Sequence, residues 1–148
     1  MRAVVQRVKR ACVDIDGKTI SAIQKGLMVL LGIGDEDTAA DADYIAQKLT
    51  ELRIFEDADG KMNMSVTDVG GEVLIVSQFT LHGDARKGRR PSFIHAARPE
   101  KAIPLYEYVI NSVSAHVPVK CGRFGADMDV SLVNDGPVTI LLDSTRLF

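Results

Sequence analysis

The chain opens with apolar and polar residues in alternation. Residues 3–8 and 11–16 follow this two-residue period, which is typical of half-buried strands. Asp16-Gly17 then supplies a turn before a further strand over 19–23. The segment 26–32 is continuously apolar and bounded by glycines, which predicts a central strand covered on both faces. The first part of the chain is therefore predicted to form antiparallel strands around a buried one.

Two later segments carry the period of a helix. The first has one apolar stripe, made of Ala42, Ile45, Leu49 and Leu52. The acidic run 35–38 stands where it would cap this helix, and a metal site is the alternative reading of the same residues. The second helix is predicted from Pro99 or Pro104 to His116, because Pro118 prevents its continuation.

Turn residues divide the remaining segments. Asp57-Ala58-Asp59-Gly60 predicts a tight turn; it resembles part of a calcium loop but lacks the required glutamate. Strands are predicted over 72–80, 128–133 and 138–143.

Asn134-Asp135-Gly136-Pro137 would ordinarily form a hairpin turn between the last two of these strands, and a cis Gly136-Pro137 bond is the alternative. Strands at both ends with two main helices between them predict an α+β fold. Its core would be a mostly antiparallel β-sheet or barrel, formed by one domain over residues 1–148.

Composition narrows the classes of function. The 148 residues carry a formal net charge of −2, so any contact with a polyanion must come from a local basic patch. Cys12 and Cys121 lie far apart without metal-ligand spacing, which favours a reducing compartment such as the cytoplasm. No apolar run approaches the length of a membrane span, and the N-terminus has no signal-peptide pattern.

Ser77-Gln78-Phe79-Thr80-Leu81 closes an apolar run with two hydroxyls and an amide. These uncharged groups are suited to recognition at a pocket, and satisfaction of neighbouring backbone groups is the alternative. Thr80 would need a base to act as a nucleophile, and the sequence shows none beside it. His82 is predicted to lie already in a turn.

A second candidate site is basic. Arg86, Lys87, Arg89 and Arg90 fall within five positions, a density that favours phosphate binding, although a solvated loop would look the same. Phe124 lies in a predicted loop over 122–126, where its ring is available to stack on a base.

The two motifs together resemble those of the bacterial-type D-aminoacyl-tRNA deacylases. Ser77-Gln78-Phe79-Thr80 is similar to the first motif of this family, and Asn134-Asp135-Gly136-Pro137-Val138-Thr139 to the second. The similarity covers nearly the whole chain and includes residues 1–7, 52–55, 87–93 and 124–128.

The resemblance implies a homodimer in which a cis Gly136-Pro137 enters the pocket of the other subunit beside Ser77 to Thr80. It implies hydrolysis of D-aminoacyl-tRNA, and also of glycine mischarged on tRNA(Ala), without an obligatory metal or cofactor.

The family's roles carry over to matching positions. Ser77, Gln78, Phe79 and Thr80 would form the catalytic segment, and Gly136 and Pro137 would select chirality while Arg7 holds them. Phe124 and the loop around it would border the terminal adenosine, and Met128 would belong to the residues that bind the substrate and select its chirality. Arg86, Lys87, Arg89 and Arg90 would contact tRNA.

Because no side-chain base is evident, water attack assisted by the tRNA 2′-OH is the favoured mechanism, and a Thr80 acyl-enzyme is the rival. A noncatalytic RNA-binding module and a generic hydrolase of small esters are the alternative functions.

Overall fold

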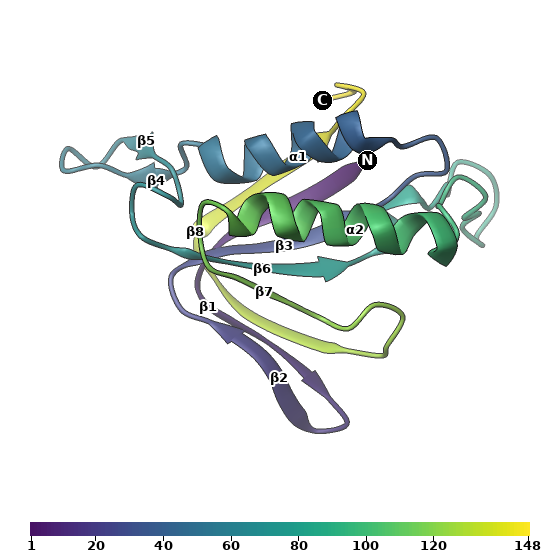
Figure 1. Cartoon of the computed structure of the whole chain (residues 1–148), viewed down its shortest axis with the longest axis horizontal. Coiled ribbons are helices and arrows are strands. Elements are labelled where there is room, and N and C mark those ends of the chain that lie inside the picture. Colours follow the sequence, from purple (N-terminus) through teal and green to yellow (C-terminus); the bar gives the residue numbers. More distant parts are fainter.

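The computed structural model describes residues 1–148, with two α-helices packed across one face of a strongly curved sheet (Figure 1). Helix α1 (Ala39–Glu51) and helix α2 (Pro99–Ser114) confirm the two predicted helices. Their apolar stripes form the main core with the sheet, and Ile45, Leu49, Val109 and Val113 are fully buried there.

The start of α1 explains part of the acidic run. Thr38 and Asp41 form a capping box, in which the Asp41 carboxylate accepts hydrogen bonds from the Thr38 N–H at 2.8 Å and hydroxyl at 3.0 Å. No group of three or more His, Cys, Asp or Glu side chains has an arrangement that could hold a metal ion. Neither α-helix combines the length and apolar character needed to cross a membrane.

A single long strand organises the sheet. Strand β1 (Arg2–Ile15) is continuous, although its sequence predicts two shorter strands. One side of β1 pairs with β3 (Gly26–Gly32) and then with β2 (Lys18–Ile23), and the other side pairs with β8 (Asp129–Asp143); all three pairings are antiparallel.

The other half of the sheet is parallel. Strand β6 (Glu72–Ser77) pairs with β3 in parallel, and β7 (Val119–Cys121) pairs in parallel with β6. The sheet is therefore mixed, and the prediction of mainly antiparallel pairing is correct only around β1. The central, doubly covered position predicted for residues 26–32 is confirmed, because β3 lies between β1 and β6 and is almost entirely buried.

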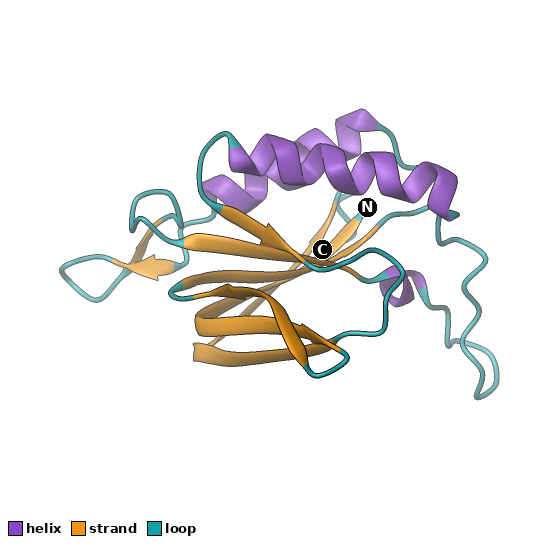
Figure 2. Cartoon of the chain, turned by 60° about the horizontal axis from the view of Figure 1, so that its bottom comes forward, coloured by secondary structure: helices purple, strands orange, loops and turns teal.

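The sheet curves into a nearly closed barrel (Figure 2). The edge strands β2 and β7 approach each other, and the Ser21 hydroxyl donates a hydrogen bond to the Cys121 carbonyl at 2.6 Å. A second apolar cluster fills the inside of this curve, and it includes Val8, Val13, Ile23, Met28 and Leu74.

A small hairpin of β4 (Phe55–Glu56) and β5 (Met62–Met64) projects from the end of the molecule (Figure 1). Its turn is the one predicted from Asp57 to Gly60, and the Asp57 carboxylate accepts hydrogen bonds from the Asp59 and Lys61 N–H groups.

Two further predicted local structures are wrong. The strand expected over 72–80 ends at Ser77, and residues Phe79–His82 form a 3₁₀ turn, η1. The hairpin expected at Asn134 to Pro137 is absent, because β8 continues through this segment and both of its halves pair with β1. Between the partners of Gln6 and Val8, residues 135–138 bulge out opposite Arg7.

Candidate active site

The end of β6 opens into a cavity of about 330 Å³. The segment Ser77 to Phe79 lines this cavity, together with the loop that carries Phe124 and Met128. The structure thus brings together five of the residues predicted from sequence for catalysis and substrate binding.

The polar wall forms because the chain leaves the sheet after Ser77. The Gln78 N–H still donates to the Leu31 carbonyl at 2.8 Å, which ties the start of the turn to β3. Gly32 permits this close approach, since a Cβ at that position would lie 2.8 Å from the Gln78 carbonyl oxygen. The backbone then turns within η1, so the N–H groups of its first residues have no carbonyl partner inside the turn.

Thr80 lies exposed on η1, and its side-chain hydroxyl has one hydrogen-bond partner, the Gln78 amide. No histidine or carboxylate contacts this hydroxyl. His82 instead directs its Nε2 to the Gly32 carbonyl at 3.1 Å. Burial lowers the pKa of His82, which keeps its imidazole neutral at pH 7. The turn therefore contains hydrogen-bonding groups but no activated nucleophile.

Aromatic rings surround the cavity. The Phe124 ring packs on Tyr106 of α2 with a centroid distance of 5.9 Å, and the Tyr106 hydroxyl donates to the Ile75 carbonyl at 2.9 Å. Burial raises the pKa of this phenol. Phe79 is 56% exposed and meets Phe93 edge to face at 5.3 Å. Phe79 and Phe124 are thus the two aromatic residues that line the cavity.

Arg7 holds the second motif, at a different place on the protein. Its guanidinium is buried and donates from Nε to the Asp135 carbonyl at 3.1 Å and from Nη1 to the Ile54 carbonyl at 2.6 Å. The Asp135 carboxylate lies 3.6 Å from the same Nε. Arg7 therefore joins the base of the β4–β5 hairpin to the bulge of β8.

The bulge presents Gly136 and Pro137 to solvent. Their peptide bond is cis, and Gly136 has a φ of +127°, a conformation that favours glycine. The Asn134 side chain closes the bulge by accepting the Val138 N–H at 3.0 Å. A Cβ on Gly136 would lie 3.0 Å from Nη2 of Arg7, so the guanidinium also packs closely against this glycine.

The two motifs lie apart within one chain. Arg7, which faces the bulge, pairs with Leu27, and Leu27 pairs with Val73 of β6, whereas Ser77 lies four residues further along β6. Three strand spacings, roughly 14 Å, separate β8 from β6 across the sheet. Gly136 and Pro137 do not line the cavity of their own chain.

The basic loop follows η1 directly. Backbone hydrogen bonds between Asp84 and Ser92 close the loop. Arg86 forms a two-pronged ion pair with Asp84, at 2.9 and 2.7 Å, and this pair lowers the pKa of the Asp84 carboxyl. Lys87, Arg89 and Arg90 are exposed without an ion pair, so they are the three cations available to a phosphate.

The sequence of the chain is similar to those of known proteins along nearly its whole length. The family model for D-Tyr-tRNA(Tyr) deacylase matches residues 4–143. Two proteins named D-aminoacyl-tRNA deacylase, from Thermosipho africanus and Desulfatibacillum aliphaticivorans, are 56% and 59% identical to the chain. The alignments cover 100% of the chain and of the first relative, and 97% of the chain and 99% of the second.

Two solved structures have the same fold. The c-Myc DNA Unwinding Element Binding Protein superposes with a TM-score of 0.92 at 46% identity, covering 97% of this chain and 98% of that one. A probable eukaryotic D-amino acid tRNA deacylase gives a TM-score of 0.79 at 20% identity, covering 95% and 97% of the two chains.

The chain belongs to the D-Tyr-tRNA(Tyr) deacylase family. The family recognised from the two motifs is thereby confirmed, and so is the class of enzyme, a D-aminoacyl-tRNA deacylase.

Proposed function

We propose that this protein hydrolyses the ester bond between a D-amino acid and the 3′ end of tRNA, releasing the free D-amino acid and tRNA. The observation that carries this proposal is full-length similarity, at 56–59% identity, to proteins named for that activity. The cavity beside Ser77 to Phe79 is the place in the chain that suits the reacting ester. Its setting would be the cytoplasm, as the resemblance and the cysteine usage imply.

The complete site forms between two copies of the chain. Gly136 and Pro137 are exposed and rigidly held, yet lie three strands from the cavity of their own protomer. In a homodimer, this bulge enters the cavity of the partner and its carbonyl oxygens accept hydrogen bonds from the α-ammonium of the substrate. The resulting contact leaves room for hydrogen on one face of the α-carbon but excludes a side chain.

This geometry selects D-amino acids by excluding the side chain of an L-amino acid. An L-amino acid would direct its side chain at the bulge, whereas the side chain of a D-amino acid points out of the cavity. Glycine has no side chain to exclude, so glycine mischarged on tRNA(Ala) is also a substrate.

Catalysis then depends on the turn and on the substrate itself. The N–H groups of Phe79 and Thr80 stabilise the negative charge that develops on the ester oxygen, and the Gln78 amide orients the ester. Water attacks the carbonyl carbon with assistance from the ribose 2′-OH, the bond to the 3′ oxygen breaks, and that oxygen takes up a proton. The isolation of the Thr80 hydroxyl from any base supports this route over an acyl-enzyme.

The remaining residues bind the acceptor end of tRNA. Phe124 and Met128 border the terminal adenosine, with the Phe124 ring supplying a stacking surface. The exposed cations Lys87, Arg89 and Arg90 contact phosphates, while Arg86 is neutralised by Asp84 and contributes less.

Complementation between two variants tests the shared site. Gln78→Ala damages the cavity and the double change Gly136→Ala/Pro137→Ala damages the bulge, so each homodimer is expected to have little D-Tyr-tRNA deacylation. Random mixing of the subunits should restore about a quarter of the wild-type sites, because half of the dimers then have one intact site out of two. A mixture with heterodimers verified by mass spectrometry but without recovered activity would contradict a site shared between chains.

A nucleic-acid-binding module without catalysis is the second candidate. A relative of solved structure, 46% identical to this chain, is named as a DNA unwinding element binding protein. The basic loop and the exposed Phe79 ring would serve such binding. Saturable, salt-sensitive binding of a single strand by a preparation that leaves D-Tyr-tRNA intact would favour this candidate over the deacylase.

A further inference from the structure

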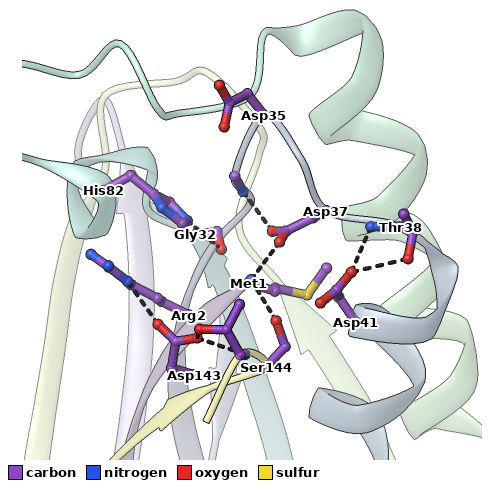
Figure 3. A network of polar contacts seen from close by, with 12 residues as sticks. Met1, Arg2, Gly32, Asp35, Asp37, Thr38, Asp41, His82, Asp143 and Ser144 are labelled. Atoms are coloured by element: carbon purple, nitrogen blue, oxygen red, sulfur yellow. Dashed lines mark hydrogen bonds and ion pairs between the residues drawn. The ribbon is translucent and has the colours of Figure 1, made fainter. Parts of the chain in front are cut away.

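The turn η1, which carries the proposed oxyanion donors, is held by the second residue of the chain. Arg2 donates from Nη1 to the Leu81 carbonyl at 2.9 Å, and from Nε to the Asp143 carboxylate at 3.0 Å. Figure 3 shows the Arg2 guanidinium beside the Asp143 carboxylate, with a dashed line between them. One guanidinium thus joins η1 to the end of β8.

Asp143, to which Arg2 is bound, is itself held in place. Asp143 is 3% exposed, and one of its oxygens accepts the Thr145 N–H at 2.8 Å and hydroxyl at 2.6 Å. The other oxygen is left for Arg2. Burial alone would raise the pKa of Asp143, but the hydrogen bonds from Thr145 and Arg2 outweigh it and the pKa lies below its usual value. The Arg2 guanidinium therefore meets a carboxylate that stays charged at neutral pH.

The backbone beside Arg2 is equally constrained. The Met1 ammonium donates to the Asp37 carboxylate at 2.6 Å and to the Ser144 hydroxyl at 2.7 Å (Figure 3). The second oxygen of Asp37 accepts the Gly34 N–H at 2.6 Å. These contacts join the start of β1 to the loop after β3 and to the residue after β8, so Arg2 extends from a fixed position.

The Leu81 carbonyl lies near the end of a turn of only four residues. Carbonyls at this end of a helical turn lack partners within it, and a charged donor supplies one of the stronger hydrogen bonds available to them. Without that bond, the turn keeps its backbone hydrogen bonds, among them those from the Leu81 N–H to the Gln78 carbonyl at 3.2 Å and from the Gly83 N–H to the Thr80 carbonyl at 2.9 Å. The orientation of the turn on the sheet would then depend on the bond from the Gln78 N–H to the Leu31 carbonyl and on the contact of His82 with the Gly32 carbonyl.

We propose that Arg2 is a positioning residue that orients η1, and with it the N–H groups of Phe79 and Thr80, toward the reacting ester. This inference rests on the proposed function for its catalytic consequence. Arg7 holds the bulge that enters the partner's cavity, and Arg2 on the same strand holds the turn that forms the chain's own cavity. Strand β1 therefore positions both of the segments that one chain contributes to catalysis.

Hydrogen exchange of the intact protein tests the positioning without relying on activity. In Arg2→Gln, amides in the segment 78–83 should exchange about tenfold faster, the factor expected for loss of one hydrogen bond to a charged group. Segments in α1 and β3 should be unchanged. Arg10→Gln is the matched control, because Arg10 is an exposed arginine on the same strand whose side chain forms no hydrogen bond or ion pair.

Deacylation kinetics test whether the orientation of η1 by Arg2 affects catalysis. Arg2→Gln should lower kcat for D-Tyr-tRNA about tenfold with little change in KM, and Arg2→Lys should recover part of the loss by donating to the Leu81 carbonyl. Unchanged exchange in segment 78–83, or equal acceleration in α1 and β3, would overturn the proposal. If the wild-type protein lacks deacylation, the proposed function fails, and the exchange measurement still decides whether Arg2 positions the turn.

Discussion

Arg7 donates a hydrogen bond from Nε to the backbone carbonyl of Asp135, at 3.1 Å, and so fixes the residue that precedes Gly136. Its Nη1 is bound at the same time to the Ile54 carbonyl. Arg7 as a whole is 5% exposed, so water competes little for either contact. Gly136 and Pro137 are therefore presented on a rigid support, as the proposed chiral selection requires.

Gly136→Ala is expected to disturb this support. The new Cβ would lie 3.0 Å from both Arg7 Nη2 and Val138 Cγ2, at a φ of +127°. Strain of this kind costs about 1–3 kcal/mol, so urea unfolding should show a loss in that range, together with slower D-Tyr-tRNA deacylation.

Gly60→Ala is the control for backbone strain alone. Gly60 has a φ of +73° and open space where its Cβ would lie. It should lose some stability but keep wild-type deacylation. If Gly60→Ala slowed deacylation as much as Gly136→Ala, the bulge would have no special role.

Thr80→Ala is expected to keep most of the turnover, because the Thr80 hydroxyl contacts only the Gln78 amide. Replacement of the terminal adenosine by 2′-deoxyadenosine should instead slow the reaction strongly. Single-turnover deacylation of the two tRNA substrates measures both effects. A Thr80→Ala enzyme that is inactive but folded would favour the acyl-enzyme.

The four cations of the basic loop are expected to contribute unequally to tRNA binding. Arg86 is engaged by Asp84, whereas Arg89 is exposed without an ion pair. Arg89→Gln should weaken tRNA binding more than Arg86→Gln, and it should reduce the slope of log Kd against log salt by about 0.7–0.9. Equal effects of the two substitutions would show that the ion pair with Asp84 does not restrain Arg86.

The buried imidazole of His82 gives stability a dependence on pH. Its pKa is lowered from the ordinary value of 6.5 by burial, so the unfolded chain takes up a proton in acid before the folded protein does. The free energy of unfolding should therefore fall as pH drops below about 6.5. Urea titrations of the wild type and His82→Gln at pH 7.5 and 5.5 should show a smaller fall in the variant. An equal fall in the free energy of unfolding in both proteins would show that a group other than His82 takes up the proton.

The spacing of apolar residues along the chain was enough to predict helix α1 and strand β3. The stripe of Ile45 and Leu49 defines α1, and the apolar run over 26–32 defines β3. The parallel pairing of β3 with β6 was not predicted, because a continuous apolar run shows that a strand is covered on both faces but does not say in which direction each neighbour runs; β3 itself has one antiparallel and one parallel neighbour. The sequence also placed Ser77, Phe124 and Met128 around one cavity only through the family resemblance, because they come from separate elements.

The segment Asn134 to Pro137 shows where local reasoning fails. Glycine and proline suit a hairpin turn and a bulge equally well, and the choice depends on whether the following residues pair with the preceding ones. Here both flanks pair with β1, and Arg7 fills the space opposite the bulge. The contact of Arg2 with Leu81 was missed for a similar reason, since 79 positions separate the two residues and no motif connects them.

The most direct test of the central claim compares deacylation of D-Tyr-tRNA and L-Tyr-tRNA by the purified protein in metal-free buffer. The account predicts rapid loss of the D-ester and an intact L-ester. Equal hydrolysis of both would leave an esterase without the proposed chiral exclusion. Persistence of both esters would contradict the deacylase function itself.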